Sequence, residues 1–116
     1  MERGEVWDVD FPPPPGKPTR ELAGPHPALV VSTKDNSANP MVMVVPFTSK
    51  SNALRFPYTL MVTPSAENGL TVQSVLLVLQ LRAVGRARLK SKMGSLEAAF
   101  LREADRLIRE MLGFQG

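Results

Sequence analysis

Hydrophobic and polar positions alternate at the start of the chain and then gather into short apolar runs. Trp7, Val9 and Phe11 alternate with two aspartates, which is the period of a half-buried strand. Prolines follow directly, so this strand is expected to end, and 12–25 is predicted to be one long exposed loop. Apolar runs rich in β-branched residues predict strands at the following positions: 28–31, 41–45, 58–62, 75–81 and a short one at 84–89. Turns are expected at 34–40 and 64–69.

The hydrophobic period changes near the C-terminus. Apolar residues recur there at spacings of three and four, which predicts an amphipathic helix on the following residues: Leu96, Phe100, Ala104, Leu107, Ile108 and Met111. Ser95 is the expected N-cap, Glu97 suits the positive first turn, and Gly113 is expected to end the helix. Five or six short strands followed by one helix predict a single domain, a small bent β-barrel or sandwich with a helical lid.

Composition removes several classes of function. The 116 residues contain no cysteine and one histidine, which excludes disulfide scaffolds, thiolate zinc sites, cysteine nucleophiles and multi-histidine metal centres. Apolar runs such as 75–79 are far too short to span a bilayer, and the first residues lack the apolar core of a secretory signal. A small cytoplasmic protein is therefore expected.

Positive charge is concentrated in the middle of the chain. The net charge is +3, but residues 36–94 hold one acid and seven bases, most of them close together over 82–92. This run has two interpretations: a solvated loop that keeps the protein soluble, or a stripe that contacts the phosphates of a nucleic acid. Charge alone does not separate them.

Five segments, in order along the chain, resemble the motifs of one known family. These segments are MERGEVW at 1–7, ELAGPHPALVV at 21–31, VPFTS at 45–49, NGL at 68–70 with SVLLVLQLR at 74–82, and MGSL at 93–96. They are spread over residues 1–96 in the family's order, so the match extends over nearly the whole chain, which resembles the MazF/PemK (Kid-like) toxins.

The resemblance implies a mainly β fold, a small SH3-like β-barrel of five to seven strands with a C-terminal helix, as a single domain over 1–116. It implies the toxin of a toxin–antitoxin pair: a homodimeric, sequence-specific endoribonuclease that cleaves single-stranded RNA, including mRNA, without a metal or other cofactor. Cleavage would leave a 2′,3′-cyclic phosphate and a 5′-OH. The implied protein partner is an antitoxin whose acidic, disordered tail folds over the RNA groove.

The resemblance also assigns candidate catalytic residues. Thr48 matches the threonine of the family's Thr-Ser pair, and His26 stands where the family has a catalytic arginine. Imidazole can transfer protons near neutral pH but is a poorer permanent cation than guanidinium, so Lys17 or Arg20 would supply the missing charge. Alternatively, His26 is a loop residue ordered between two prolines, without a chemical role.

Other candidates are supporting or RNA-binding residues. Arg82 is expected to stabilise phosphate charge, Glu21 to support the active loop, and Leu79 replaces a family acid. The candidate RNA-binding residues are Lys17, Arg20, Ser49, Phe56, Gln80, Arg86 and Arg88. Among the aromatics, Phe56 is the expected stacking platform, whereas Trp7 and Phe47 are expected in the core. The alternative function is a non-catalytic binder of the same fold, either similar to the CcdB gyrase inhibitors or an inactive RNA-binding relative.

Overall fold

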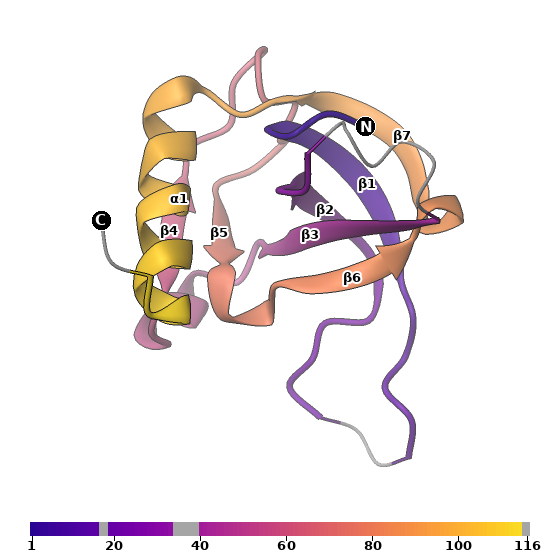
Figure 1. Cartoon of the computed structure of the whole chain (residues 1–116). Helices are drawn as coiled ribbons and strands as arrows, with labels where there is room; N and C mark the ends of the chain where they lie inside the picture. Colours follow the sequence, from indigo (N-terminus) through magenta and orange to yellow (C-terminus); the bar gives the residue numbers. More distant parts are fainter. Residues whose placement is uncertain (17–18, 34–39, 115–116) are drawn as a thin grey trace.

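The structure, a computed structural model, describes residues 1–16, 19–33 and 40–114. Seven strands and one α-helix are found in these ranges (Figure 1): β1 (Glu5–Phe11), β2 (Gly24–Val30), β3 (Met41–Thr48), β4 (Thr59–Val62), β5 (Ser74–Leu77), β6 (Arg82–Gly85), β7 (Leu89–Ser95) and α1 (Ala98–Leu112). Short 3₁₀ turns connect some of them: η2 (Ser51–Arg55), η3 (Val78–Gln80) and η4 (Arg86–Arg88).

The strands form an antiparallel sheet in the order β4–β5–β3–β2–β1–β7, and β6 pairs with the first half of β3. β3 bends from one part of the sheet into the other, because its last two residues pair with β5 while the preceding ones pair with β2. No ladder joins the edge strands β4 and β7 in the described ranges. The mainly β fold with a C-terminal helix is thus confirmed, but hydrogen bonds do not close the sheet.

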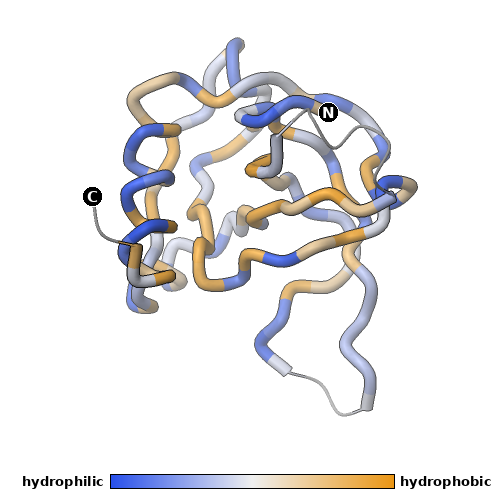
Figure 2. Tube along the Cα trace, viewed as in Figure 1, coloured by the Kyte–Doolittle hydropathy of each residue, from blue (hydrophilic) through white to orange (hydrophobic). Residues whose placement is uncertain are grey.

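The helix covers one end of the sheet. Ala104 is fully buried, and Phe100, Leu107 and Ile108 pack on the same core cluster, which contains Phe47. Figure 2 shows hydrophilic residues on the outer side of this helix. The predicted amphipathic helix is therefore confirmed, and in the described part of the chain no helix is long and apolar enough to cross a membrane.

A second core cluster lies between β1, β2, β3, β6 and the start of β7. It is formed by Val9, Phe11, Ala28, Val30, Val42, Val44, Val84 and Leu89. Trp7 is only partly buried against this cluster, and its indole N–H donates to the Glu5 carboxylate at 2.9 Å. Phe47 is a core residue as predicted, whereas Trp7 lies at the core's edge.

Two predicted strand boundaries are wrong. β2 begins at Gly24 rather than 28, so Pro25 and Pro27 are strand residues paired with β1. These prolines are tolerated because β3 pairs with β2 only from Ala28 onward, which leaves one side of 24–27 without a ladder bond to lose. The strand predicted over 75–81 ends at Leu77, where the chain turns into η3.

The predictions around the last strand need correction as well. The strand expected over 84–89 is divided between β6 and β7 by η4, and β7 itself was missed. Because β7 is an edge strand in which the consecutive residues Lys90, Ser91 and Lys92 are all exposed, its sequence resembles a polar loop. Ser95 is not the N-cap but the last residue of β7; Glu97 precedes the helix, and Gly113 ends it in the left-handed conformation, as expected.

A buried turn joins β7 and the helix start to the segment before β5. The fully buried Asn68 side chain donates to the carboxylate of Glu97 at 3.0 Å and accepts from the backbone N–H of Ser65 and of Leu70. Gly94 lies against this turn, where a Cβ atom would be 2.3 Å from the carbonyl oxygen of Glu67. The predicted turn over 64–69 is confirmed; the one over 34–40 lies, except for Pro40, outside the described residues.

Candidate active site

The two principal catalytic candidates lie at the same end of the β2–β3 pair. Ala28 opposite Pro46 is the last pair of that ladder, and His26 and Thr48 are each two residues beyond it. The two strands separate here because β3 turns to pair with β5, where Thr48 is opposite Val75. Side chains two residues apart in a strand lie on the same face, so His26 and Thr48 extend the same row.

A surface pocket of about 360 Å³ opens beside Thr48. It is formed by the segment before β2, the end of β3, η2 and η3, and its lining residues are Arg20, Leu22, Thr48, Lys50, Asn52, Ala53, Arg55, Phe56, Pro57, Thr59, Leu77, Leu79 and Gln80. The Thr48 side chain is nearly buried, and its hydroxyl oxygen accepts a bond from the Lys50 backbone N–H at 3.3 Å. Four of the predicted site residues therefore meet in one pocket: Arg20, Thr48, Phe56 and Gln80.

The pocket combines an aromatic ring with exposed cations. The guanidinium of Arg55 lies 4.7 Å from the centre of the Phe56 ring, and that of Arg20 lies 5.5 Å from it. Both distances are in the range of cation–π attraction. Lys50 is a third exposed cation of the lining, and none of the three forms an ion pair with another described residue. Their charges are therefore available to an anion in the pocket.

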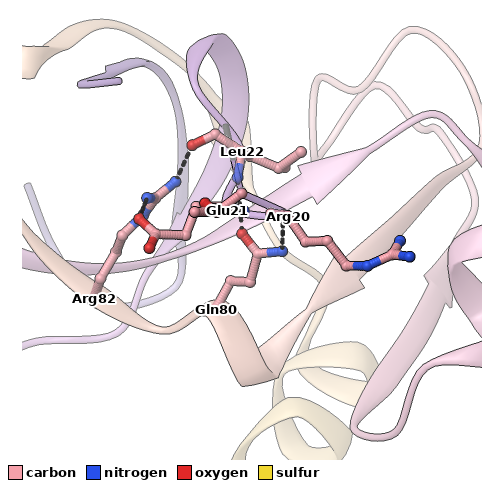
Figure 3. A network of polar contacts seen from close by, with 6 residues as sticks. Arg20, Glu21, Leu22, Gln80 and Arg82 are labelled. Atoms are coloured by element: carbon pink, nitrogen blue, oxygen red, sulfur yellow. Dashed lines mark hydrogen bonds and ion pairs between the residues drawn. The ribbon is translucent and has the colours of Figure 1, made fainter. Parts of the chain in front are cut away.

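The segment 20–22 is held by side chains from η3 and from the start of β6 (Figure 3). The Gln80 side-chain oxygen accepts from the Leu22 N–H at 3.0 Å, and its NH₂ group donates to the Arg20 carbonyl at 3.0 Å. Arg82 donates to the Leu22 carbonyl. We call these three hydrogen bonds the loop anchor.

Arg82 is half-buried next to the pocket rather than in its lining. Its guanidinium lies 4.3 Å from the centre of the Phe11 ring and 3.5 Å from a carboxylate oxygen of Glu21. Burial lowers the pKa of Arg82, while the Glu21 carboxylate opposes that shift. This arrangement brings together two of the predicted site residues, Glu21 and Arg82.

His26 lies beside Phe11, the same ring against which the Arg82 guanidinium packs. The His26 ring is half-buried, and its centre is 6.4 Å from that of Phe11, which also carries the Arg82 guanidinium. The histidine is not among the pocket's lining residues. It therefore lies beside the pocket, separated from the cations that surround Phe56.

The remaining predicted RNA-binding residues are elsewhere or outside the description. Ser49 is exposed next to Thr48, and Lys17 lies outside the described residues. Arg88 pairs with Asp10 at 3.6 Å, and Arg86 contacts the sulfur of Met1 at 3.1 Å. The cationic run over 82–92 is thus partly neutralised by two acids of β1 and by Glu21. The pocket is instead lined by Lys50, Asn52 and Arg55, which the sequence analysis did not select.

Comparison with known proteins identifies the chain. Residues 2–112 match the family described as the PemK-like, MazF-like toxin of type II toxin–antitoxin systems. The chain belongs to this family. A curated relative, endoribonuclease MazF9 of Mycobacterium tuberculosis, is 30% identical over 115 residues, covering 94% of this chain and 93% of the relative.

Solved structures of the family have the same fold. The crystal structure of MazF from Deinococcus radiodurans superposes with a TM-score of 0.79 at 25% identity, covering 97% of this chain and 96% of that one. A crystal structure of a MazE–MazF complex from the same organism superposes with a TM-score of 0.74 at 25% identity, covering 99% and 98%.

Proposed function

We propose that this chain is the toxin of a toxin–antitoxin pair and a sequence-specific endoribonuclease that cleaves single-stranded RNA, mRNA included, and so inhibits translation. The observation that carries the proposal is the position of Thr48, beside a pocket that combines Phe56 with three exposed cations. A phosphate next to the threonine hydroxyl and a base next to the aromatic ring match the two parts of a nucleotide. The relative named endoribonuclease MazF9 supports the same activity.

The proposed reaction is an internal phosphoryl transfer. The ribose 2′-oxygen attacks phosphorus and the bond to the 5′-oxygen breaks, leaving a 2′,3′-cyclic phosphate and a 5′-OH. One group must take the 2′-OH proton, and a proton must reach the leaving oxygen. We assign proton transfer to His26 and a hydrogen bond to a phosphate oxygen to Thr48, while Arg82 and Glu21 support the loop beside them.

The RNA is held by charge and stacking. Arg20, Lys50 and Arg55 would contact phosphates, and the Phe56 face would stack on a base. Lys17, Ser49 and Arg86 remain candidates along the path of a longer strand, whereas Arg88 pairs with Asp10 and is expected to contribute little. Single-strand binding of this kind weakens steeply with salt, because each neutralised phosphate releases counterions. The cations of this pocket would also bind the acidic tail of an antitoxin, which would compete with RNA for the same charges. The MazE–MazF structure supports such a partner.

A second copy of the chain is the other proposed partner. The outer face of the β3–β6 pair is apolar: Met41 and Met43 are 44% and 37% exposed, opposite Gly85 and Ala83. Such a face suits a homodimer interface. Light scattering at micromolar concentration is expected to give the mass of a dimer, and a monomer would contradict this part of the proposal.

The function is tested by incubating the purified protein with end-labelled single-stranded RNA in EDTA. Cleavage at defined positions, with 2′,3′-cyclic phosphate and 5′-OH ends, is expected, because the proposed chemistry uses only side chains. Thr48→Val, which keeps the shape of the side chain and removes the hydroxyl, should lose most of the activity. Activity that requires added magnesium would overturn the metal-independent mechanism. Intact RNA that remains bound would instead support the non-catalytic alternative.

A further inference from the structure

The turn that follows β5 gives neighbouring residues opposite environments. η3 interrupts the strand after Leu77, leaves Leu79 56% exposed and turns Gln80 toward the segment before β2. The polar end of Gln80 therefore meets backbone rather than solvent.

The Gln80 side-chain amide imitates the backbone N–H and C=O of one residue of a neighbouring parallel strand. Its oxygen accepts from the N–H of residue 22 and its nitrogen donates to the carbonyl of residue 20, each at 3.0 Å. In a parallel ladder, the N–H and the C=O of one residue make the same pair of bonds to residues two apart. Arg82 adds a third bond, to the Leu22 carbonyl, so 20–22 is fixed although β2 starts only at Gly24.

The fixed segment carries Arg20, whose guanidinium lies 5.5 Å from the centre of the Phe56 ring. Arg20 and Gln80 are both part of the pocket lining. The position of this cation thus depends on backbone that Gln80 holds, and Gln80 itself has its oxygen and its nitrogen engaged.

We propose that Gln80 is a positioning residue: through the loop anchor it holds Arg20 over Phe56 and thereby sets the affinity of the pocket for a phosphate of the bound RNA. This inference rests on the proposed function. It assigns Gln80 an indirect effect on RNA binding, in place of a direct contact with a base.

The first test needs no RNA. Gln80→Met keeps the length of the side chain and removes both hydrogen bonds, so the Leu22 amide should exchange with deuterium roughly three- to tenfold faster, the cost of one lost hydrogen bond. Gln80→Asn, whose amide is one methylene shorter, should accelerate exchange too. The matched control is Gln73→Met at an exposed position, with no change expected at Leu22. Unchanged exchange in both Gln80 variants would overturn the proposal.

The second test is a double-mutant cycle on RNA affinity, measured by fluorescence anisotropy with a fully 2′-O-methylated single-stranded RNA that cannot be cleaved. Gln80→Met should weaken binding roughly three- to tenfold in the parental protein but by less than about twofold in an Arg20→Ala background, because coupled residues are non-additive. Equal losses in both backgrounds would indicate a direct contact and refute the positioning role. Faster exchange at Leu22 together with no RNA binding by the parental protein would overturn the proposed function while leaving the loop anchor intact.

Discussion

Two substitutions, each of which removes one positive charge, test whether RNA binds at the pocket or along the cationic run over 82–92. Arg55→Gln and Arg88→Gln remove the same charge, but Arg55 lies at the Phe56 ring and forms no ion pair with another described residue, whereas Arg88 pairs with Asp10 at 3.6 Å. A cation that is already paired with a carboxylate attracts a phosphate only weakly, because the two charges of the pair largely cancel. We therefore expect Arg55→Gln to weaken RNA binding and Arg88→Gln to change it little.

The magnitude follows from counterion release. One phosphate contact to a single strand contributes a slope of about −0.7 to the plot of log affinity against log salt. Arg55→Gln should make that slope shallower by about 0.7, so that a fourfold rise in salt costs about 2.6-fold less affinity than in the parental protein. Loss of the cation–π contact with Phe56 changes the affinity at all salt concentrations and leaves the slope alone.

The assay is an anisotropy titration of the uncleavable 2′-O-methylated RNA at several salt concentrations, with circular dichroism to verify folding. A third variant, Lys50→Gln, should reproduce the slope change of Arg55→Gln, because Lys50 is an exposed cation of the same lining. Equal slope changes for Arg55→Gln and Arg88→Gln would refute the reasoning, since they would show that the pairing with Asp10 leaves Arg88 available to RNA.

Three further predictions concern stability and catalysis. Gly94→Ala should lower the free energy of unfolding by about 1–3 kcal/mol or more in urea denaturation, since its Cβ would be 2.3 Å from a backbone oxygen; Gly85→Ala, where nothing lies within 4 Å, should change it by less than about 0.5 kcal/mol, and equal effects would contradict this. His26→Ala should slow cleavage about 10²–10⁴-fold with little change in RNA binding, and His26→Arg should restore part of the rate and move the pH optimum upward; a fully active His26→Ala would make the histidine a bystander. Burial would raise the pKa of Glu5, but hydrogen bonds from Trp7 and from the Glu2 backbone, with Lys92 at 3.1 Å, lower it from 4.5 to about 2. The stability it contributes is therefore complete above pH 4.5 and lost as the pH falls toward 2, so Glu5→Gln should be destabilising at pH 7 and nearly neutral at pH 2 in thermal unfolding.

The elements that were predicted well from the sequence are those whose hydrophobic period is visible in their own residues. The alternation around Val9 and the apolar stripe of α1 reflect one buried side each, so their periods are visible without knowing any partner. β7 was missed because a strand at an edge keeps Lys90 and Lys92 exposed, and nothing local distinguishes such a strand from a polar loop. The prolines of β2 were assigned to a loop for a similar reason, since their tolerance depends on where β3 starts to pair.

The candidate site divides in the same way. Thr48 was found from a motif that is contiguous in the chain, and Phe56 was selected among the aromatic residues as the exposed one; the two do share a pocket. The cationic run over 82–92 looked like the most basic surface because its carboxylate partners, among them Asp10 and Glu5, are far away in the sequence and meet it only when β1 pairs with β7. Lys50 and Arg55 carried no distinguishing signal until η2 placed them beside the aromatic ring.

The pairing of β1 with β7 also determines when the protein can become active during its synthesis. Glu5 is opposite Ser95, so the chain between these two residues must all be synthesised before the first strand meets its second neighbour. Contacts so distant in sequence form slowly, because the long intervening segment must first be closed into a loop. A nascent chain shorter than this lacks both the outer edge of the sheet and the helix that follows it. The folded, active protein can therefore appear only after β7 has been synthesised, which delays the activity relative to the synthesis of β1.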